Sequence, residues 1–386
     1  MKVLYVWHSL VEPEYQKIVH ALKSAGVDVL SILPSEWKEG GRDLSAGLLP
    51  SDLFRIFPVI GKNRINRFFF PDIVGILKTI REFRPDIVHL VEEPSSLVNL
   101  EFLTLLKMAS PRTKIMVQSF ENIHSGRKFL ARVVERIVLA GVDCLITVPH
   151  EGFDVWKKKG FEKCIVQIPL GIDLQTFSPS KKKEEPEQTA SQSLKVGYVG
   201  RLVEEKGIYD LFEACASLAK EGHPLSLSYR GNGPERENLE RRIQAGHSSL
   251  DVQVSAALPV LELKEFYRSL DVLVLPSRTT PTWKEQFGRV IVEAMACGTP
   301  VIGSSSGEIP NVIGKGGMVF EEGNVPALEE CLKKLLLSPG LRKDLSENAR
   351  KATEQNFSWD KIALDLKTLY GSLLFEMPVE KRRNFP

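Results

Sequence analysis

The chain has little or nothing of several features that mark particular classes of protein. Its five cysteines are scattered and form no CxxC pair, which argues against a disulfide scaffold and against a cysteine zinc site. No uninterrupted apolar run reaches the about 18 residues that a membrane-spanning helix requires, and the start MKVLYVWHSLVEPE lacks the apolar region of a signal peptide. The formal net charge is only +2, too small for a general affinity for nucleic acid. These absences predict a cytoplasmic protein with reduced thiols and no nucleic-acid partner.

Two ligand motifs are also missing. The segment HSLVEPEYQ, which follows the first expected strand, contains no G-x-G-x-x-G, and this argues against a Rossmann-type NAD-binding protein. No DxD motif occurs either, so the sequence predicts no metal site and no bound cofactor.

The pattern that is present is an alternating one. Short runs rich in Val, Ile and Leu alternate with amphipathic stretches of about 10–15 residues, which predicts an α/β protein with parallel sheets. A chain of 386 residues exceeds the usual size of one core, so two domains are expected. Residues 173–193 are polar and without periodicity, and we interpret them as a linker between two doubly wound Rossmann-like halves. The expected strands are 3–7, 28–33, 86–91, 114–119, 143–148 and 165–168 before the linker, and 194–199, 225–229, 252–254, 272–275 and 300–302 after it.

One stretch of the first half, residues 55–84, combines basic and aromatic side chains. It holds seven basic residues against two acidic ones. One interpretation is a surface that rests on anionic lipid or binds an acidic or lipid-linked glycan. The other, which we favour, is that Phe68, Phe69 and Phe70 pack in the core while the charges are solvated.

The segment PSRTTPTWKEQFGRVIVEAMACGTPVI, residues 276–302, places two glutamates eight residues apart around a glycine that opens an apolar helix. If this helix starts near Phe287, the free N–H groups of Phe287, Gly288 and Arg289 form a seat for an anion such as a diphosphate. Glu285 then lies beside that seat and Glu293 deeper in the helix. The two carboxylates are placed to accept hydrogen bonds from a sugar and from a ribose, which suits a nucleotide sugar. Taken singly, they are also explained as a helix N-terminal acid and a surface charge.

Two further loops follow expected strands of the second half. Gly200, Arg201, Lys206 and Gly207 are explained either as an ordinary strand-to-helix turn or as a phosphate site, because open α/β sheets bind ligands at the carboxyl ends of their strands. The second loop is GNGP, which contains Asn232 and Gly233 and is weak evidence by itself.

These segments together resemble the retaining glycosyltransferases of family four, which have the two-lobed GT-B fold and a Glu-x7-Glu signature. LKVGYVGRLVEEKGIYDLFEA, YRGNGPERENLE, ALPVLELKEFYRSLDVLVLPS and SGEIPNVIGKGGMVF stand in the order of that family. The resemblance implies a first Rossmann-like lobe over 1–172, the linker, a nucleotide-sugar lobe over 194–356, a cleft between the lobes, and a last helix within 357–386 that returns to the first lobe. The donor-binding residues that it implies are Gly200, Arg201, Lys206, Asn232, Gly233, Leu258, Glu285, Phe287, Gly288, Arg289 and Glu293.

The first lobe departs from the common pattern of that family. The loop HSLVEPEYQ lacks the usual glycine pair. Glu121, or Phe120 if the register is shifted by one, stands where many members have a histidine. VHLVEEP and FEN resemble a subset of the family, which implies Glu92, Glu93 and Asn122 on the acceptor side. Glu121 is either a contact to the sugar or acceptor or a helix N-terminal acid. His8, His124 and His150 are interpreted as loop or rim residues.

The function that the resemblance implies is a retaining, metal-independent transfer of a hexose-type unit from a nucleoside diphosphate sugar. Catalytic roles fall to Glu285, Arg201, Lys206 and Glu121. The acceptor is a glycan, a lipid-linked glycan or a small molecule, and peripheral contact with the inner membrane face through residues 55–84 is an added alternative. Two other functions remain open: a GT-B nucleotide-sugar epimerase, and a non-catalytic nucleotide-sugar-binding protein.

Overall fold

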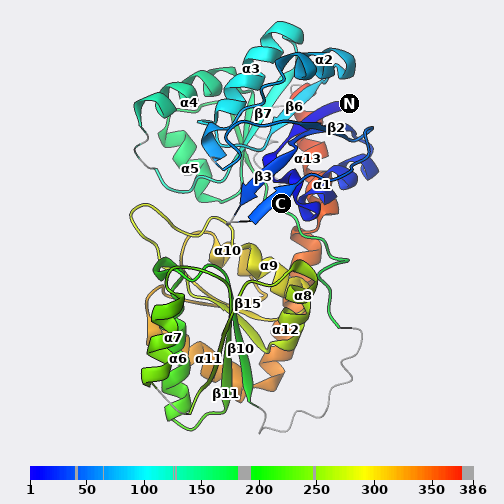
Figure 1. Cartoon of the computed structure of the whole chain (residues 1–386). Helices are drawn as coiled ribbons and strands as arrows, with labels where there is room; N and C mark the ends of the chain where they lie inside the picture. Colours follow the sequence, from blue (N-terminus) through cyan, green and yellow to red (C-terminus); the bar gives the residue numbers. More distant parts are fainter. Residues whose placement is uncertain are drawn as a thin grey trace. The chain divides into compact units, whose positions relative to one another are not determined.

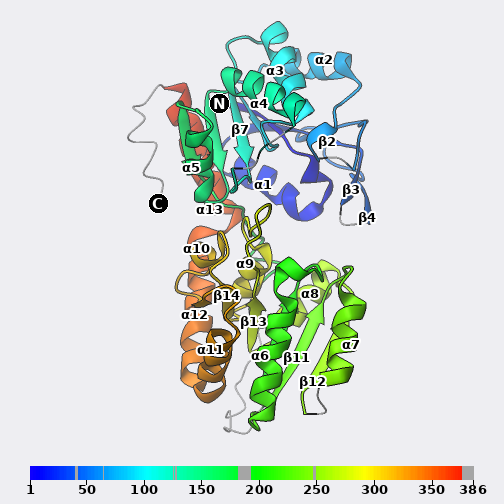
Figure 2. The same cartoon turned by 90° about the vertical axis from the view of Figure 1, so that its left-hand side faces the viewer.

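The computed structural model describes residues 1–39, 42–63, 65–124, 126, 128–180, 193–246 and 249–375. The chain forms two compact units, which are shown from two sides in Figures 1 and 2. Unit 1 comprises Met1–Gly171 and Trp359–Pro386, and unit 2 comprises Ile172–Ser358. Most of the expected linker, residues 181–192, lies outside the described residues.

Unit 1 is built on a seven-stranded parallel sheet in the order β5-β2-β1-β6-β7-β8-β9. Its central strands β1, β6 and β7 are buried almost throughout, because helices cover both faces of a parallel sheet. A separate antiparallel hairpin pairs β3 with β4. The strands are β1 (Lys2–Val6), β2 (Asp28–Pro34), β3 (Glu36–Glu39), β4 (Arg42–Ser45), β5 (Phe54–Phe57), β6 (Ile87–Leu90), β7 (Lys114–Ser119), β8 (Cys144–Thr147) and β9 (Cys164–Gln167).

The helices of unit 1 include one from the end of the chain. Helix α13 packs against α1, and α2, α3 and α4 follow one another in a row (Figures 1 and 2). The indole N–H of Trp359, the first residue of α13, donates to the Glu14 carboxylate at 3.4 Å. The helices are η1 (His8–Val11), α1 (Pro13–Ser24), η2 (Ile65–Arg67), α2 (Ile73–Phe83), α3 (Leu97–Ala109), α4 (Phe129–Gly141), α5 (Glu151–Lys158) and α13 (Trp359–Leu374).

Unit 2 contains a six-stranded parallel sheet in the order β12-β11-β10-β13-β14-β15. Its strands are β10 (Leu194–Val199), β11 (Leu225–Arg230), β12 (Asp251–Ser255), β13 (Val272–Leu275), β14 (Val301–Ser304) and β15 (Gly317–Phe320). Its helices are η3 (Glu204–Lys206), α6 (Ile208–Lys220), α7 (Arg236–Gly246), α8 (Val260–Ser269), α9 (Arg289–Ala296), α10 (Ile309–Ile313), α11 (Val325–Leu337) and α12 (Pro339–Asn356). Strand β15 of unit 2 and strands β3, β4 and β5 of unit 1 were not expected from the sequence. Each has only four residues, and none of them consists of four apolar residues.

In the basic and aromatic stretch 55–84, two of the three consecutive phenylalanine rings are packed in the core, as the favoured interpretation predicted. Phe68 and Phe70 are buried in the core of unit 1, and Phe69 is half-buried. The basic residues Arg67, Lys78, Arg81 and Arg84 are exposed, whereas Arg64 lies outside the described residues.

The sequence predicted reduced cysteines and no membrane-spanning helix. All five cysteines are buried and form no disulfide. Across the described ranges, no helix combines the length and the apolar character that crossing a bilayer demands.

Candidate functional site

The loops after β10 and β13 of unit 2 bring together a cation and a carboxylate that are far apart in the sequence. The Lys206 ammonium donates to a Glu285 oxygen at 2.5 Å and lies 4.7 Å from the ring centroid of Trp283. The Ser277 hydroxyl donates to the same Glu285 oxygen at 3.1 Å. Both charged side chains are largely buried, at 13% and 11% exposure. Because both side chains are buried, each charge is stabilised by the opposite charge beside it. The contacts with Ser277 and Trp283 fix the positions of the two side chains before any ligand binds.

A glycine lets these two loops approach each other. Gly207 closes the turn after Lys206 with φ of +65°, and a Cβ atom there would lie 1.9 Å from the carbonyl oxygen of Pro276. Only glycine fits at this position. The close approach of the two backbones is what places Lys206 against Glu285.

Arg201 and the loop after β11 lie at the same sheet edge. The Arg201 side chain is 63% exposed, with one guanidinium nitrogen 3.8 Å from Glu205. The backbone N–H of Leu202 donates to the carbonyl of Asn232 at 2.9 Å, which ties the loops after β10 and β11 together. Gly200 and Gly233 are half-buried in these loops and Asn232 is exposed. Leu258, which is half-buried, lies in the next loop, after β12.

The helix after Glu285 starts later than the sequence analysis expected. Helix α9 begins at Arg289, with Gly288 as its N-cap in the left-handed region at φ +76°. The expected start near Phe287 is therefore wrong by two residues. Phe287 is buried, with its ring 5.9 Å from that of Phe357. The helix N-terminus still points its first N–H groups at the edge that carries Lys206 and Glu285.

Glu293 is buried inside α9 and is engaged by two groups of its own unit. The Tyr267 hydroxyl donates to it at 2.7 Å, and the Arg289 guanidinium lies 2.9 Å from its other oxygen. Burial, together with the neighbouring Glu293 charge, raises the pKa of Tyr267 well above its ordinary value, so this hydroxyl stays a donor. These contacts offset the cost of burying the Glu293 carboxylate, and its burial excludes the alternative of a surface charge.

A second group of polar residues lies in unit 1, at the carboxyl ends of β1, β6 and β7. Glu92 accepts from the backbone N–H of His8 at 3.1 Å and contacts the His8 Nδ1 at 2.5 Å. Both residues are buried, and the His8 ring packs against Trp37 at 4.5 Å between centroids. The expectation that His8 is a loop or rim residue is thus wrong: it is a buried partner of Glu92.

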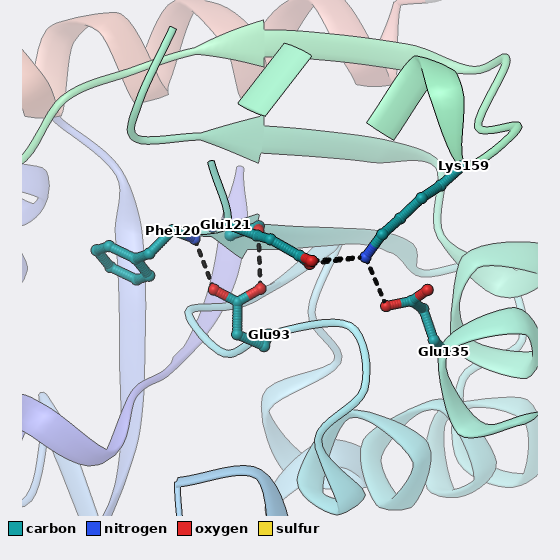
Figure 3. A network of polar contacts seen from close by, with 6 residues as sticks. Glu93, Phe120, Glu121, Glu135 and Lys159 are labelled. Carbon is teal, nitrogen blue, oxygen red and sulfur yellow. Dashed lines mark hydrogen bonds and ion pairs between the residues drawn. The ribbon is translucent and has the colours of Figure 1, made fainter. Parts of the chain in front are cut away.

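The other two acids of this group, Glu93 and Glu121, accept hydrogen bonds from different residues (Figure 3). Glu93 accepts from the Ser119 hydroxyl and from the Phe120 N–H, both at 2.7 Å. Glu121 points away from Glu93, and both of its oxygens accept from the Lys159 ammonium at 2.8 Å.

The ammonium of Lys159 is shared with a second acid. It also bonds Glu135 of α4 at 3.1 Å, and all three side chains are buried. Because α4 begins only at Phe129, the alternative of Glu121 as a helix N-terminal acid is wrong. Asn122 is buried beside Glu121, whereas His124 and His150 are exposed, as expected of loop residues.

Several residues of these sites were missed by the sequence analysis, namely His8, Lys159, Trp283, Ser277 and Tyr267. Ser277, Trp283 and Tyr267 lie inside the quoted segments of the second half. Even so, each of the five becomes significant only through a partner at least eight positions away. Within the described ranges, no group of three or more His, Cys, Asp and Glu side chains is arranged to hold a metal ion.

The two parallel-sheet Rossmann-like units define a GT-B fold, and solved structures of that fold are similar over almost the whole chain. Sucrose-phosphate synthase from Thermosynechococcus elongatus superposes with a TM-score of 0.70 over 97% of this chain and 100% of that one, at 20% identity. Anabaena HepE in complex with UDP and glucose superposes with a TM-score of 0.67 over 96% and 100%, at 17% identity. At such identities the similarity establishes the fold alone.

Sequence comparisons match glycosyltransferases, and the matching family model lies within unit 2. Residues 180–352 match the family described as glycosyl transferases group 1. The capsular polysaccharide biosynthesis glycosyltransferase CapM of Staphylococcus aureus is 30% identical over 210 residues, which are 53% of this chain and 54% of that protein. The chain spans little more than half the length of CapM and of two D-inositol 3-phosphate glycosyltransferases that it also matches.

Proposed function

We propose that the protein is a glycosyltransferase that moves a hexose-type unit from a nucleoside diphosphate sugar to an acceptor, with retention of the anomeric configuration and without a metal ion. One observation carries the proposal: Arg201, the Lys206–Glu285 pair and the N-terminus of α9 converge on one edge of the sheet in unit 2. Cations and free N–H groups at such an edge suit a diphosphate. The match of residues 180–352 to glycosyl transferases group 1 supports the same reading.

In the proposed reaction, the bond between the anomeric carbon and the diphosphate oxygen breaks while the acceptor oxygen bonds to the same face of the sugar. The departing diphosphate takes the acceptor proton. Arg201, Lys206 and the first N–H groups of α9 stabilise the negative charge that develops on the diphosphate, which is the role that a fixed set of donors performs best. Glu285 binds the transferred sugar, and Glu293 binds the ribose.

On the acceptor side, the proposal assigns hydrogen bonding to Glu92, Glu93 and Asn122, and adds His8. The Glu92 carboxylate at 2.5 Å from Nδ1 fixes the orientation of the His8 ring, so that its other nitrogen has a defined direction. We expect His8→Gln to raise the KM for the acceptor without changing the affinity for the donor. Equal affinity for both substrates in the variant and the native protein would remove His8 from the acceptor site.

The proposal is tested first by donor binding. Because HepE was solved with UDP and glucose, UDP-glucose is the first donor to titrate by calorimetry, followed by GDP-, ADP- and dTDP-sugars. Lys206→Ala should weaken binding by about 10- to 100-fold, since a hydrogen bond to a charged group contributes roughly 1.5–3 kcal/mol. Lys195→Ala is the matched control, because Lys195 is an exposed lysine near the other end of β10.

Four results would contradict parts of the proposal. If no nucleotide sugar binds, or if both lysine variants lose affinity alike, the phosphate site is wrong. A product with inverted anomeric configuration by NMR would refute retention. A loss of transfer in EDTA that is restored by magnesium would refute metal independence.

A further inference from the structure

Helix α4 of unit 1 exposes large apolar side chains. Phe129 and Leu130 are 71% and 76% exposed, and Val133 and Ile137 are 38% and 45% exposed. Single exposed apolar residues are normal on a protein surface, but four in three turns of one helix form a patch.

Basic residues run beside this apolar row. Lys128, Arg132 and Arg136 are exposed and recur every four residues, as Phe129, Val133 and Ile137 do. Residues four apart lie on the same face of a helix, so the two rows are parallel neighbours. We refer to seven exposed residues together as the α4 surface: Lys128, Phe129, Leu130, Arg132, Val133, Arg136 and Ile137.

The opposite side of α4 fixes the helix to the rest of unit 1. Val138 is buried, and Gly141 lies so close to Leu103 of α3 that a Cβ atom would approach its Cδ1 to 2.4 Å. The single acidic residue of α4, Glu135, is buried and bonded to Lys159, which Figure 3 shows. It therefore does not neutralise the positive row, and α4 has contacts to the rest of unit 1 that do not involve the exposed residues.

We propose that the α4 surface binds the surface of an anionic lipid bilayer, with α4 lying in the plane of the interface. The apolar row enters the boundary between headgroups and acyl chains, and the basic row binds the negatively charged headgroups. A second copy of the chain is a poor occupant of the same surface, because pairing would bring two positive rows together.

The position of α4 connects this surface with the acceptor-side residues of unit 1. Helix α4 follows the loop that leaves the carboxyl end of β7, the edge at which Glu92, Glu93 and Glu121 lie. Phe129 and Leu130, the most exposed of the apolar residues, are at that end of the helix. This step rests on the proposed function: an acceptor embedded in the bilayer would be presented to the same edge of the sheet.

The test is the co-sedimentation of the full chain with lipid vesicles, without donor or acceptor. We expect binding to vesicles that contain phosphatidylglycerol in phosphatidylcholine, little binding to pure phosphatidylcholine, and weaker binding at high salt. The double variants Phe129→Ser with Leu130→Ser, and Arg132→Gln with Arg136→Gln, should each bind about 10-fold more weakly or worse. The control is Ile73→Ser with Val74→Ser, which removes exposed apolar residues from α2, within the basic stretch 55–84.

The outcomes separate this inference from the proposed activity. Failure to bind anionic vesicles, or an equal loss in the α2 control, would overturn the α4 surface while leaving donor binding untouched. A dimer in sedimentation equilibrium that the Phe129 and Leu130 changes dissociate would assign the surface to a second copy instead. Unchanged melting temperatures of the variants establish that any loss of binding is not a loss of folding.

Discussion

At the scale of single residues, the two glutamates of the Glu-x7-Glu segment differ in what surrounds them. Glu285 contacts a lysine and a serine on the loops, whereas Glu293 contacts a tyrosine and an arginine within the helical layer. Both carboxylates already bond protein groups. A ligand that binds to either one must therefore bind beside these groups or displace them. Their roles can therefore be separated only by comparing substitutions that remove the charge with substitutions that remove the partner.

We expect Glu285→Gln to lower turnover by about 10- to 100-fold while the free nucleoside diphosphate still binds, because its proposed partner is the sugar. Glu293→Gln should instead weaken binding of the nucleoside diphosphate by a similar factor. Calorimetry and initial rates check both. Tyr267→Phe is the control, since it removes a hydrogen bond from Glu293 but keeps the carboxylate; if it weakens nucleotide binding as much as Glu293→Gln does, the effect is structural and the ribose assignment fails.

Glu121 is expected to contribute mainly to stability. Both of its oxygens bond the buried Lys159 ammonium, so Glu121→Gln should lower the free energy of unfolding by about 1–3 kcal/mol. Lys159→Met tests the same contact from the other side and should also destabilise the protein. Urea unfolding and the transfer rate are measured together. A drop in rate of about 10²-fold in Glu121→Gln alone would show instead that the carboxylate contacts the sugar or the acceptor.

At the scale of elements, the start of α9 depends on the backbone conformation of Gly288. Its φ is +76°, and a Cβ atom would lie 2.8 Å from the Ile291 side chain. Gly288→Ala should therefore destabilise the protein by about 1–2 kcal/mol and weaken donor binding by turning the first N–H groups of α9.

Gly340 offers a matched control for that change. It lies in the first turn of α12, and a Cβ atom there would meet nothing within 4 Å. Gly340→Ala should leave stability unchanged or raise it by up to about 1 kcal/mol. Equal unfolding midpoints for the two alanine variants would show that the left-handed conformation at Gly288 is not required.

At the scale of the whole molecule, the last helix belongs to the unit formed by the first part of the chain. The hydroxyl of Tyr370 in α13 is 2.7 Å from Nδ1 of His89 in β6, 281 positions away. Both residues are fully buried, and burial lowers the pKa of His89 to about 3. The histidine is thus neutral in the folded protein above about pH 3.

This buried histidine predicts a loss of stability in acid. The unfolded chain binds a proton at His89 below pH 6.5 and the folded chain does not until about pH 3, so stability falls as the pH falls through that window. Glu101 acts in the opposite sense, because burial raises its pKa to about 7 from 4.5, and its effect ends below pH 4.5. Between pH 4.5 and 3.5, His89→Gln should therefore remove about 1.4 kcal/mol per pH unit from the slope. Urea titrations at a series of pH values measure it; parallel slopes for the variant and the native protein would contradict the prediction.

The sequence by itself determined the class of fold and the sheet edge of unit 2 at which Arg201, Lys206 and Glu285 lie. Alternating apolar runs and amphipathic stretches indicated parallel sheets because a strand covered on both faces is apolar throughout, whereas a surface helix is apolar on one side only. The loops that carry Arg201, Lys206 and Glu285 could be recognised because each follows such a strand, and parallel strands place their carboxyl ends at one edge. The short strand β5 and the hairpin β3–β4 gave no such signal.

Only the tertiary structure decided which distant residues meet. His8 and Glu92 form a pair because β1 and β6 are neighbours in the sheet, although 84 positions separate the two residues. Lys159 bonds Glu121 and Glu135 because the end of α5, the loop after β7 and the buried side of α4 come together. Strand order and helix packing arise from the burial of the whole apolar surface, which no local pattern specifies; the partners of a buried charge are therefore fixed by the fold and not by its neighbours in sequence.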